Sequence, residues 1–129
     1  MTAIDTNVLV RFLTADDPRQ YQASRKLMAD AQVFIANSVI LETEWVLRAA
    51  YGLAPAEVCH ALRAVVGLTQ VTSESPERVI QALDWHAQGL DFADAFHLAS
   101  SQHQPAFKTF DGALIKHAKG LSTCAVGLP

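Results

Sequence analysis

The chain has 129 residues, of which 50% are apolar and 18% charged. This length fits one domain that buries a core without covalent staples, so we expect a single domain over residues 1–129. The apolar content leaves little room for disordered tails. The formal net charge of −3 argues against a protein that binds nucleic acid mainly through bulk positive charge.

Two further features concern the cellular location of the chain and its cysteines. The apolar stretch from Val8 to Leu13 is interrupted by Arg11 and is too short for a membrane span or a signal-peptide core, so we expect a cytoplasmic protein with no membrane association. Cys59 and Cys124 belong to no paired motif. They therefore predict neither a zinc site nor a disulfide framework, and we interpret both as interior residues.

The first half of the chain alternates apolar runs with helical patterns. Thr2–Asp5 and Val33–Ala36 are short apolar runs that end at polar residues, and each is followed by a helical pattern, as expected for buried parallel strands. Asp17-Pro18 supplies an N-cap and a proline at the first helical position, which predicts a helix to about Ala31. A second helix is predicted from Ser38 to Gly52. Its apolar residues occupy two faces, Leu41, Trp45 and Ala49 on one and Val39, Val46 and Ala50 on the other, so we expect it to be central.

The second half continues the alternation. Apolar residues from Val58 to Val66 follow the spacing of a one-faced helix that ends at Gly67. Further helices are predicted for residues 76–89, 91–103 and 111–120, and strands for residues 70–72, 106–110 and 123–126. Strands that alternate with helices predict an α/β sandwich with a mainly parallel sheet.

Four acidic residues stand where the predicted strands lead into helices. Asp5 closes the first strand, and Glu42 lies in the first turns of the helix after the second. Asp94 lies in the first turn of a later helix, and Asp111 follows the run Lys108-Thr109-Phe110. Because sites in open parallel sheets form at the carboxyl ends of the strands, we expect these four acids to meet there.

Each acid also has a structural interpretation. Asp91 and Asp111 could be helix N-caps, with Asp94 completing the cap at Asp91, and Asp5-Thr6-Asn7 could form a turn. Glu42 is harder to explain in this way. It belongs to a helix that is apolar around most of its circumference, where an unpaired carboxylate would be costly to bury.

Four clustered carboxylates require a cation, because two unit charges at 4 Å repel by roughly 4 kcal/mol at an effective dielectric constant near 20. Oxygen ligands favour Mg²⁺, with Mn²⁺ as an alternative. Such an ion supports hydrolysis of a phosphodiester. The basic residues that could contact phosphates are Arg11, Arg48, Lys108, Lys116 and Lys119.

The sequence resembles the PIN-domain family and, within it, the VapC-type toxins. The matching stretches, in family order, are Asp5–Arg11, Leu41–Arg48, Asp91–Ala99 and Thr109–Asp111. The resemblance implies a three-layer α/β/α fold and Mg²⁺-dependent endoribonuclease activity on an RNA substrate. It also implies the toxin role of a toxin–antitoxin pair, inhibition by a cognate antitoxin encoded alongside, and a homodimer.

The family's functional positions transfer residue by residue. Asp5, Glu42 and Asp94 match its three principal acids, and Asp111 matches a fourth that is less uniform among members. We expect Asp5 and Asp94 to bind the metal directly, while Glu42 and Asp111 hold metal-bound water or transfer protons. The auxiliary candidates are Asp91 and the two residues expected to fix the loop that carries Asp5, Thr6 and Asn7.

Two other function classes compete. Another Mg²⁺-dependent phosphoryl-handling α/β domain would carry paired acids, or a second Asp two residues after Asp5, and neither is present. A catalytically idle PIN-like domain that binds RNA or a partner would have lost an acid, and none is lost. We interpret His97, on the same helix face as Asp94, as a packed or hydrogen-bonded residue, and we assign neither Trp45 nor Trp85 to RNA binding.

Overall fold

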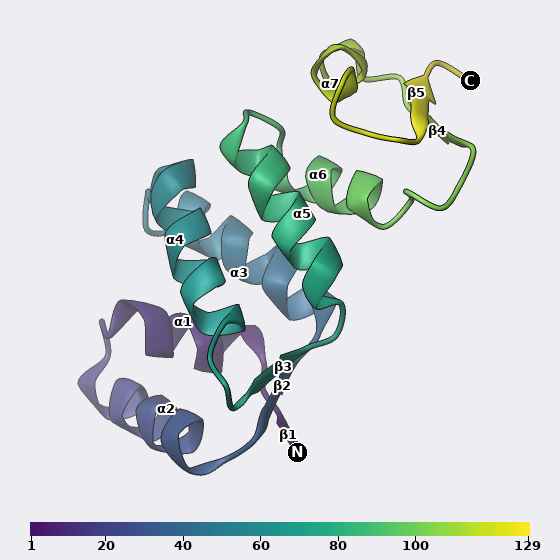
Figure 1. The fold of residues 1–129 in the computed structure, drawn as a ribbon. Helices are drawn as coiled ribbons and strands as arrows, with labels where there is room; N and C mark the ends of the chain where they lie inside the picture. Colours follow the sequence, from purple (N-terminus) through teal and green to yellow (C-terminus); the bar gives the residue numbers. More distant parts are fainter. The chain divides into compact units, whose positions relative to one another are not determined.

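The computed structural model describes residues 1–129 and contains seven helices and five strands (Figure 1). The chain divides into two compact units, unit 1 (Met1–Pro76) and unit 2 (Glu77–Pro129). All strand pairs are parallel, and they form a three-stranded sheet in unit 1 and a two-stranded sheet in unit 2. The predicted mixed α/β fold with parallel strands is therefore confirmed.

Unit 1 contains three strands and four complete helices. In chain order these are β1 (Thr2–Ala3), α1 (Thr6–Thr14), α2 (Pro18–Asp30), β2 (Val33–Ile35), α3 (Asn37–Ala49), α4 (Pro55–Val66) and β3 (Val71–Ser73). The strand order is β1-β2-β3, with Ala3 opposite Phe34 and Ile35 opposite Ser73. This register brings the carboxyl ends of the three strands to one edge of the sheet, where α1 and α3 begin.

Helix α1 follows the first strand, where the sequence indicates a helical pattern without bounds. It has nine residues, Asp5 is its N-cap, and Leu9 and Val10 are buried. The helix ends at Ala15, whose φ of 54° lies in the left-handed region that glycine usually occupies. The Asp5-Thr6-Asn7 segment is therefore the start of a helix rather than an isolated turn.

Local sequence signals predict the start of α2 correctly, whereas α4 begins before its apolar spacing does. Asp17 caps α2 by accepting a hydrogen bond from the Gln20 amide at 3.0 Å, and Pro18 is the first helical residue, as predicted. Helix α4 begins at Pro55, three residues before the apolar spacing starts at Val58. The Ala54 amide donates to Glu57 Oε1 at 3.0 Å, and this contact fixes the start of α4.

The prediction that α3 buries two apolar faces is wrong. Its buried residues are Ile40, Thr43, Glu44 and Leu47, whereas Trp45 is 57% exposed and Ala49 is exposed. These four buried positions form one stripe between the two predicted faces. Glu44 fits within the stripe because its carboxylate accepts a hydrogen bond from Arg48 Nε at 2.9 Å.

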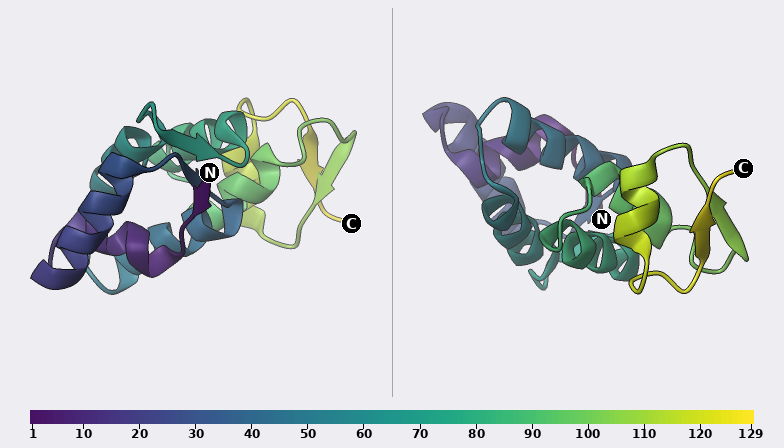
Figure 2. Two further views of the ribbon diagram at one scale, coloured as in Figure 1. Left: turned by 90° about the horizontal axis from the view of Figure 1, so that it is seen from below. Right: turned by 90° about the horizontal axis from the view of Figure 1, so that it is seen from above.

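Unit 2 is built from α5, which begins at the unit boundary, and from four later elements. In chain order the elements are α5 (Pro76–Ala87), α6 (Phe92–Ala99), β4 (Ala106–Lys108), α7 (Gly112–Ala118) and β5 (Ala125–Gly127). Strands β4 and β5 lie side by side in both views of Figure 2, with Ala106 opposite Ala125. Helix α6 ends at Ala99, earlier than the predicted end at His103.

Helices α5 and α6 carry most of the buried core residues of unit 2. Trp85 is 3% exposed, and Phe92 makes edge-to-face contacts with both His86 and Phe96. Cys59 in unit 1 and Cys124 in unit 2 are buried and form no disulfide, so the interpretation of both as interior residues is confirmed. No helix in the structure has the length and apolar character needed to cross a bilayer.

Candidate functional site

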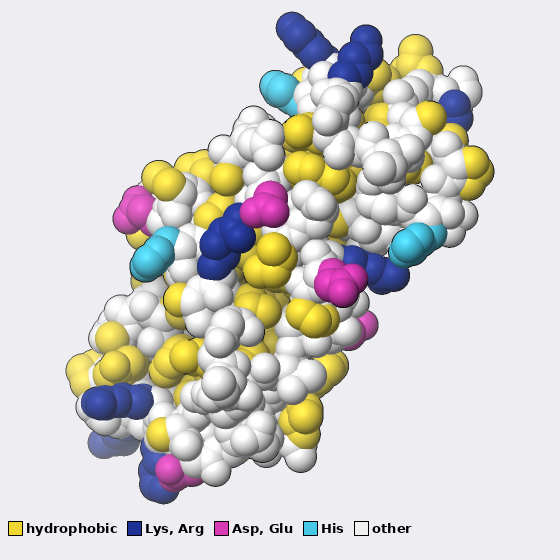
Figure 3. All heavy atoms as spheres, viewed as in Figure 1, with side chains coloured by type: hydrophobic (Ala, Val, Ile, Leu, Met, Phe, Trp, Pro, Cys, Tyr) yellow, Lys and Arg dark blue, Asp and Glu magenta, His cyan; other side chains and the backbone are white.

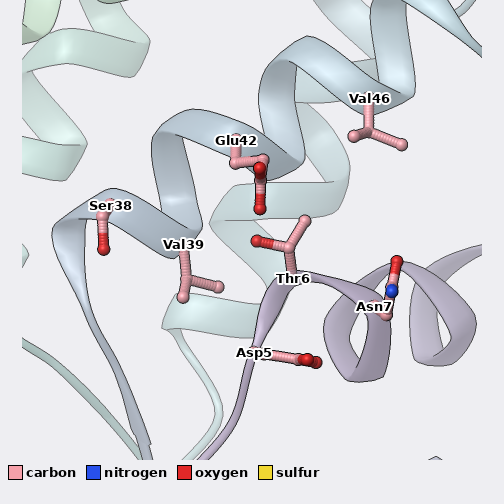
Figure 4. Close-up of a pocket in the computed structure, with 7 residues that line it drawn as sticks. All are labelled: Asp5, Thr6, Asn7, Ser38, Val39, Glu42 and Val46. Carbon is pink, nitrogen blue, oxygen red and sulfur yellow. The ribbon is translucent and has the colours of Figure 1, made fainter.

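Unit 1 contains a pocket of about 430 Å³ at the edge of the sheet where β1 and β2 lead into helices. In Figure 4 Glu42 projects from α3 toward the first turn of α1, where Asp5 and Thr6 lie. The complete lining consists of Asp5, Thr6, Asn7, Ser38, Val39, Glu42 and Val46. Two of the four predicted catalytic acids, Asp5 and Glu42, therefore share one pocket.

Asp5 has two roles within this pocket. Its Oδ1 accepts a hydrogen bond from the Val8 amide at 3.0 Å and so caps α1. Its second oxygen has no protein partner, so the cap orients the carboxylate while leaving a ligand atom available. Thr6 and Asn7 form no side-chain hydrogen bond, so the cap of Asp5, rather than these two side chains, orders the segment that carries it.

Glu42 is an exposed residue, so the expected cost of burying its carboxylate does not arise. The buried carboxylate of α3 is instead Glu44, which is 3% exposed and paired with Arg48. Sequence reasoning selected the correct helix but could not tell which of two nearby acids faces the core. Glu42 remains a candidate because it lines the pocket with Asp5.

Unit 2 contains a second acidic pocket, of about 150 Å³, formed by the loop before α6 and the first turns of α7. It contains Asp91, Asp94 and Asp111. The complete lining is Gly89, Leu90, Asp91, Asp94, Asp111, Ala113, Leu114 and His117. The remaining two predicted catalytic acids and the auxiliary Asp91 therefore share this pocket.

Two of these acids cap helices, as their structural interpretation predicts. Asp91 Oδ2 accepts from the Asp94 amide at 3.2 Å at the start of α6. Asp111 Oδ1 accepts from the amides of Ala113 at 2.9 Å and Leu114 at 3.1 Å at the start of α7. As in Asp5, each carboxylate uses one oxygen for the cap and keeps the other without a protein partner.

Asp94 is the half-buried acid of the unit 2 pocket. Burial raises the pKa of its carboxyl, the negative charges of Asp91 and Asp111 raise it further, and nearby His97 opposes them. A carboxyl in this setting is stabilised by added positive charge. The ring of His97 is exposed and forms no hydrogen bond, so the prediction of a packed or hydrogen-bonded histidine is wrong.

The two pockets share a donor set. Each contains carboxylates with oxygens free of protein partners, and no Lys or Arg lines either of them. Hard divalent cations such as Mg²⁺ prefer oxygen ligands of this kind. Neither unit by itself gathers three or more His, Cys, Asp or Glu side chains closely enough to hold a metal ion. The donor chemistry of each pocket fits a divalent cation.

Two pocket residues were missed by sequence reasoning. Ser38 lies beside Glu42 in the unit 1 pocket, and His117 lies beside Asp94 and Asp111 in the unit 2 pocket. A helical spacing of four residues places Ser38 on the face of Glu42 and His117 on the face of Ala113. The spacing was available in the sequence, but nothing in it marked these positions as pocket residues.

The basic residues fall into two groups. Arg11 is hydrogen-bonded to Gln20, Asp16 and Tyr51, and Arg48 is paired with Glu44, so both are occupied within unit 1. The lysines of unit 2 are exposed and form no ion pair there, and Figure 3 shows basic side chains projecting over α7. These lysines are Lys108, Lys116 and Lys119.

Comparison with known proteins gives one family match. The sequence profile of the PIN domain matches residues 2–120, a range that includes all the predicted site residues and extends through both units. No curated protein matches the chain.

Proposed function

This chain belongs to the PIN-domain family, whose members are generally metal-dependent nucleases, and we propose that it is a Mg²⁺-dependent endoribonuclease and the toxin of a toxin–antitoxin pair. One observation supports the nuclease proposal most strongly. Three aspartates, Asp5, Asp91 and Asp111, each use one oxygen to cap a helix and keep the other free in a pocket without Lys or Arg. We propose further that residues 1–129 act as a single domain.

The proposed roles follow from the position of each acid. Asp5 and Asp94 would hold the cation, which when bound neutralises phosphate charge and makes water more acidic. Glu42 and Asp111 would accept hydrogen bonds from the attacking water and take up its proton. Asp91 would orient the start of α6 and so the backbone of Asp94, while Thr6 and Asn7 would shape the wall around Asp5.

The direct test is hydrolysis of a labelled single-stranded RNA by the purified chain. We expect cleavage with Mg²⁺ or Mn²⁺ and none in excess EDTA, because the donor set consists of carboxylate oxygens. Readdition of Mg²⁺ should restore cleavage. Undiminished cleavage in EDTA would contradict the metal dependence, and absence of cleavage with either ion would favour the catalytically idle PIN-like alternative.

The toxin role requires a cellular test. We expect expression of the chain alone in the bacterial cytoplasm to arrest growth, and expression of Asp5→Asn to leave growth unaffected. Co-expression of the small protein encoded next to it should restore growth and give a stable complex, since acidic pockets offer a target for a basic antitoxin side chain. A wild-type chain that is soluble and harmless would instead indicate a housekeeping PIN nuclease.

The proposed homodimer has a separate measurement. Sedimentation equilibrium of the purified chain should give twice the mass of 14.0 kDa over a range of protein concentrations. A single species of monomer mass would contradict the dimer without affecting the nuclease proposal.

A further inference from the structure

Phe110 is an aromatic residue placed on the surface beside a candidate catalytic acid. It is 84% exposed, more than any other large apolar side chain in the structure. It follows β4 and directly precedes Asp111, which lines the unit 2 pocket. The ring is therefore available to another molecule directly beside an acid of that pocket.

The turn that carries Phe110 is fixed on both sides. The Thr109 amide donates to the Gly127 carbonyl at 3.0 Å, and the Asp111 amide donates to Thr109 Oγ1 at 3.0 Å. Asp111 in turn caps α7 through two backbone amides. The ring of Phe110 is therefore presented by an ordered backbone, and a ligand that stacks on it would not have to order the turn first.

The charges around Phe110 suit a nucleic acid. Lys108 lies two residues before it, is exposed, and forms no ion pair in unit 2. The chain as a whole is acidic, with a net charge of −3, so attraction to the phosphate backbone is weak. Stacking of bases on aromatic rings supplies affinity that does not depend on net charge and tolerates any base.

We propose that Phe110 stacks on an unpaired nucleobase of single-stranded RNA next to the phosphodiester that is hydrolysed. The inference rests on the proposed ribonuclease function and names the substrate class as RNA with an unstacked base at the cleavage point. Lys108 contacts a phosphate of the same strand. Asp111, the residue after Phe110, lines the acidic pocket, so the stacked base lies next to that pocket. Base-paired RNA is excluded as a substrate, because its bases are already stacked.

The test measures binding separately from cleavage. Binding of a 5′-labelled single-stranded RNA is measured by fluorescence anisotropy, with Ca²⁺ in place of Mg²⁺. An abasic RNA of the same length is measured in parallel. We expect Phe110→Ala to weaken binding of the base-bearing RNA about 5-fold to 100-fold, and Phe110→Trp to retain it. Neither change should alter binding of the abasic RNA. Leu128→Ala, at another exposed apolar residue of unit 2, is the matched control and should bind both RNAs like the wild type.

Several results decide the inference. Equal binding of the base-bearing RNA by wild type and Phe110→Ala, or an equal loss on both RNAs, would overturn it and would leave Phe110 as an apolar contact for a protein partner. Lys108→Ala should weaken binding of both RNAs alike, as expected for a phosphate contact. An unchanged melting temperature of Phe110→Ala checks that the fold is intact.

The outcome is distinguishable from that of the proposed function. Mg²⁺-dependent hydrolysis of the same RNA without an effect of Phe110→Ala on binding would refute the stacking inference alone. Binding that depends on Phe110 without any hydrolysis would support the stacking contact, and would refute the nuclease proposal together with the placement of the base beside a hydrolysed phosphodiester.

Discussion

The two units carry similar acidic pockets but use their cations differently. Unit 1 has six Lys and Arg residues against eight acids, and unit 2 has four against five. In unit 1, Arg11, Lys26 and Arg48 form ion pairs with acids of the same unit. In unit 2, three lysines near the pocket elements stay exposed and unpaired. Net charge alone therefore does not indicate where a chain can contact phosphate.

Arg11 is part of a structural cluster in unit 1. The Tyr51 hydroxyl donates to Asp16, a hydrogen bond that lowers the pKa of the Asp16 carboxyl, and Arg11 contacts both residues. This cluster joins the end of α1 to the segment after α3. Because Arg11 and Arg48 are used internally, we expect the phosphate contacts predicted for basic residues to come from the lysines of unit 2.

The largest expected effect tests whether both pockets are needed. Asp5→Asn in unit 1 and Asp94→Asn in unit 2 should each lower the rate of RNA hydrolysis by at least about 100-fold, since each removes a charged oxygen ligand. Asparagine is also a good N-cap, so Asp5→Asn should keep α1 intact. The rate is measured on labelled RNA with saturating Mg²⁺.

The matched control is Asp17→Asn, which alters an N-cap aspartate outside both pockets. It should cleave RNA like the wild type. A strong effect of Asp94→Asn combined with no effect of Asp5→Asn would show that unit 2 alone carries the chemistry.

The second prediction separates structural cations from exposed ones. Arg48→Met should lower the free energy of unfolding by about 2 kcal/mol, because it leaves the buried Glu44 carboxylate without its partner. Lys116→Met should change that free energy by less than about 0.5 kcal/mol, as is usual for surface positions, while weakening RNA binding. Urea unfolding and RNA anisotropy measure the two effects. Equal stabilities of the two variants would remove the distinction between the units.

The third prediction concerns the end of α1. Ala15 adopts a left-handed conformation with φ of 54°, so Ala15→Gly should raise the free energy of unfolding by about 0.5–1 kcal/mol. The same substitution at Ala23, an exposed position inside α2, should lower it by about 1 kcal/mol. Urea unfolding should show opposite signs for the two variants, and equal signs would contradict the strained cap.

The smallest expected effect is a pH dependence in unit 2. Since the pKa of Asp94 is raised in the folded chain, the native state retains its proton to higher pH than the unfolded state does. The free energy of unfolding of the metal-free wild type should therefore fall, relative to Asp94→Asn, as the pH rises from near 3.8 through the folded pKa. Below about pH 3.8 the free energies of unfolding of the two proteins should change with pH in parallel. Parallel pH profiles of the two proteins would contradict a desolvated Asp94.

The sequence identified what depends on a few neighbouring residues. Asp17, Asp91 and Asp111 are helix N-caps as their local patterns indicate, because a cap needs only its own side chain and the next amides. The order of strands and helices likewise followed from local periodicity. The sequence indicated a helix after Asp5 but not its end, because α1 ends at Ala15 rather than at a glycine.

Only the tertiary structure decided which side chains face the core and which share a pocket. Sequence alone could not show that Glu44 rather than Glu42 is buried, since this depends on the face of α3 that packs and on the pairing of Glu44 with Arg48. Trp45 and Trp85 are the same residue type on helices, yet one is exposed and the other buried. Local chemistry sets the elements of this chain, whereas burial and the grouping of Asp94 with Asp111 arise from contacts between residues distant in sequence.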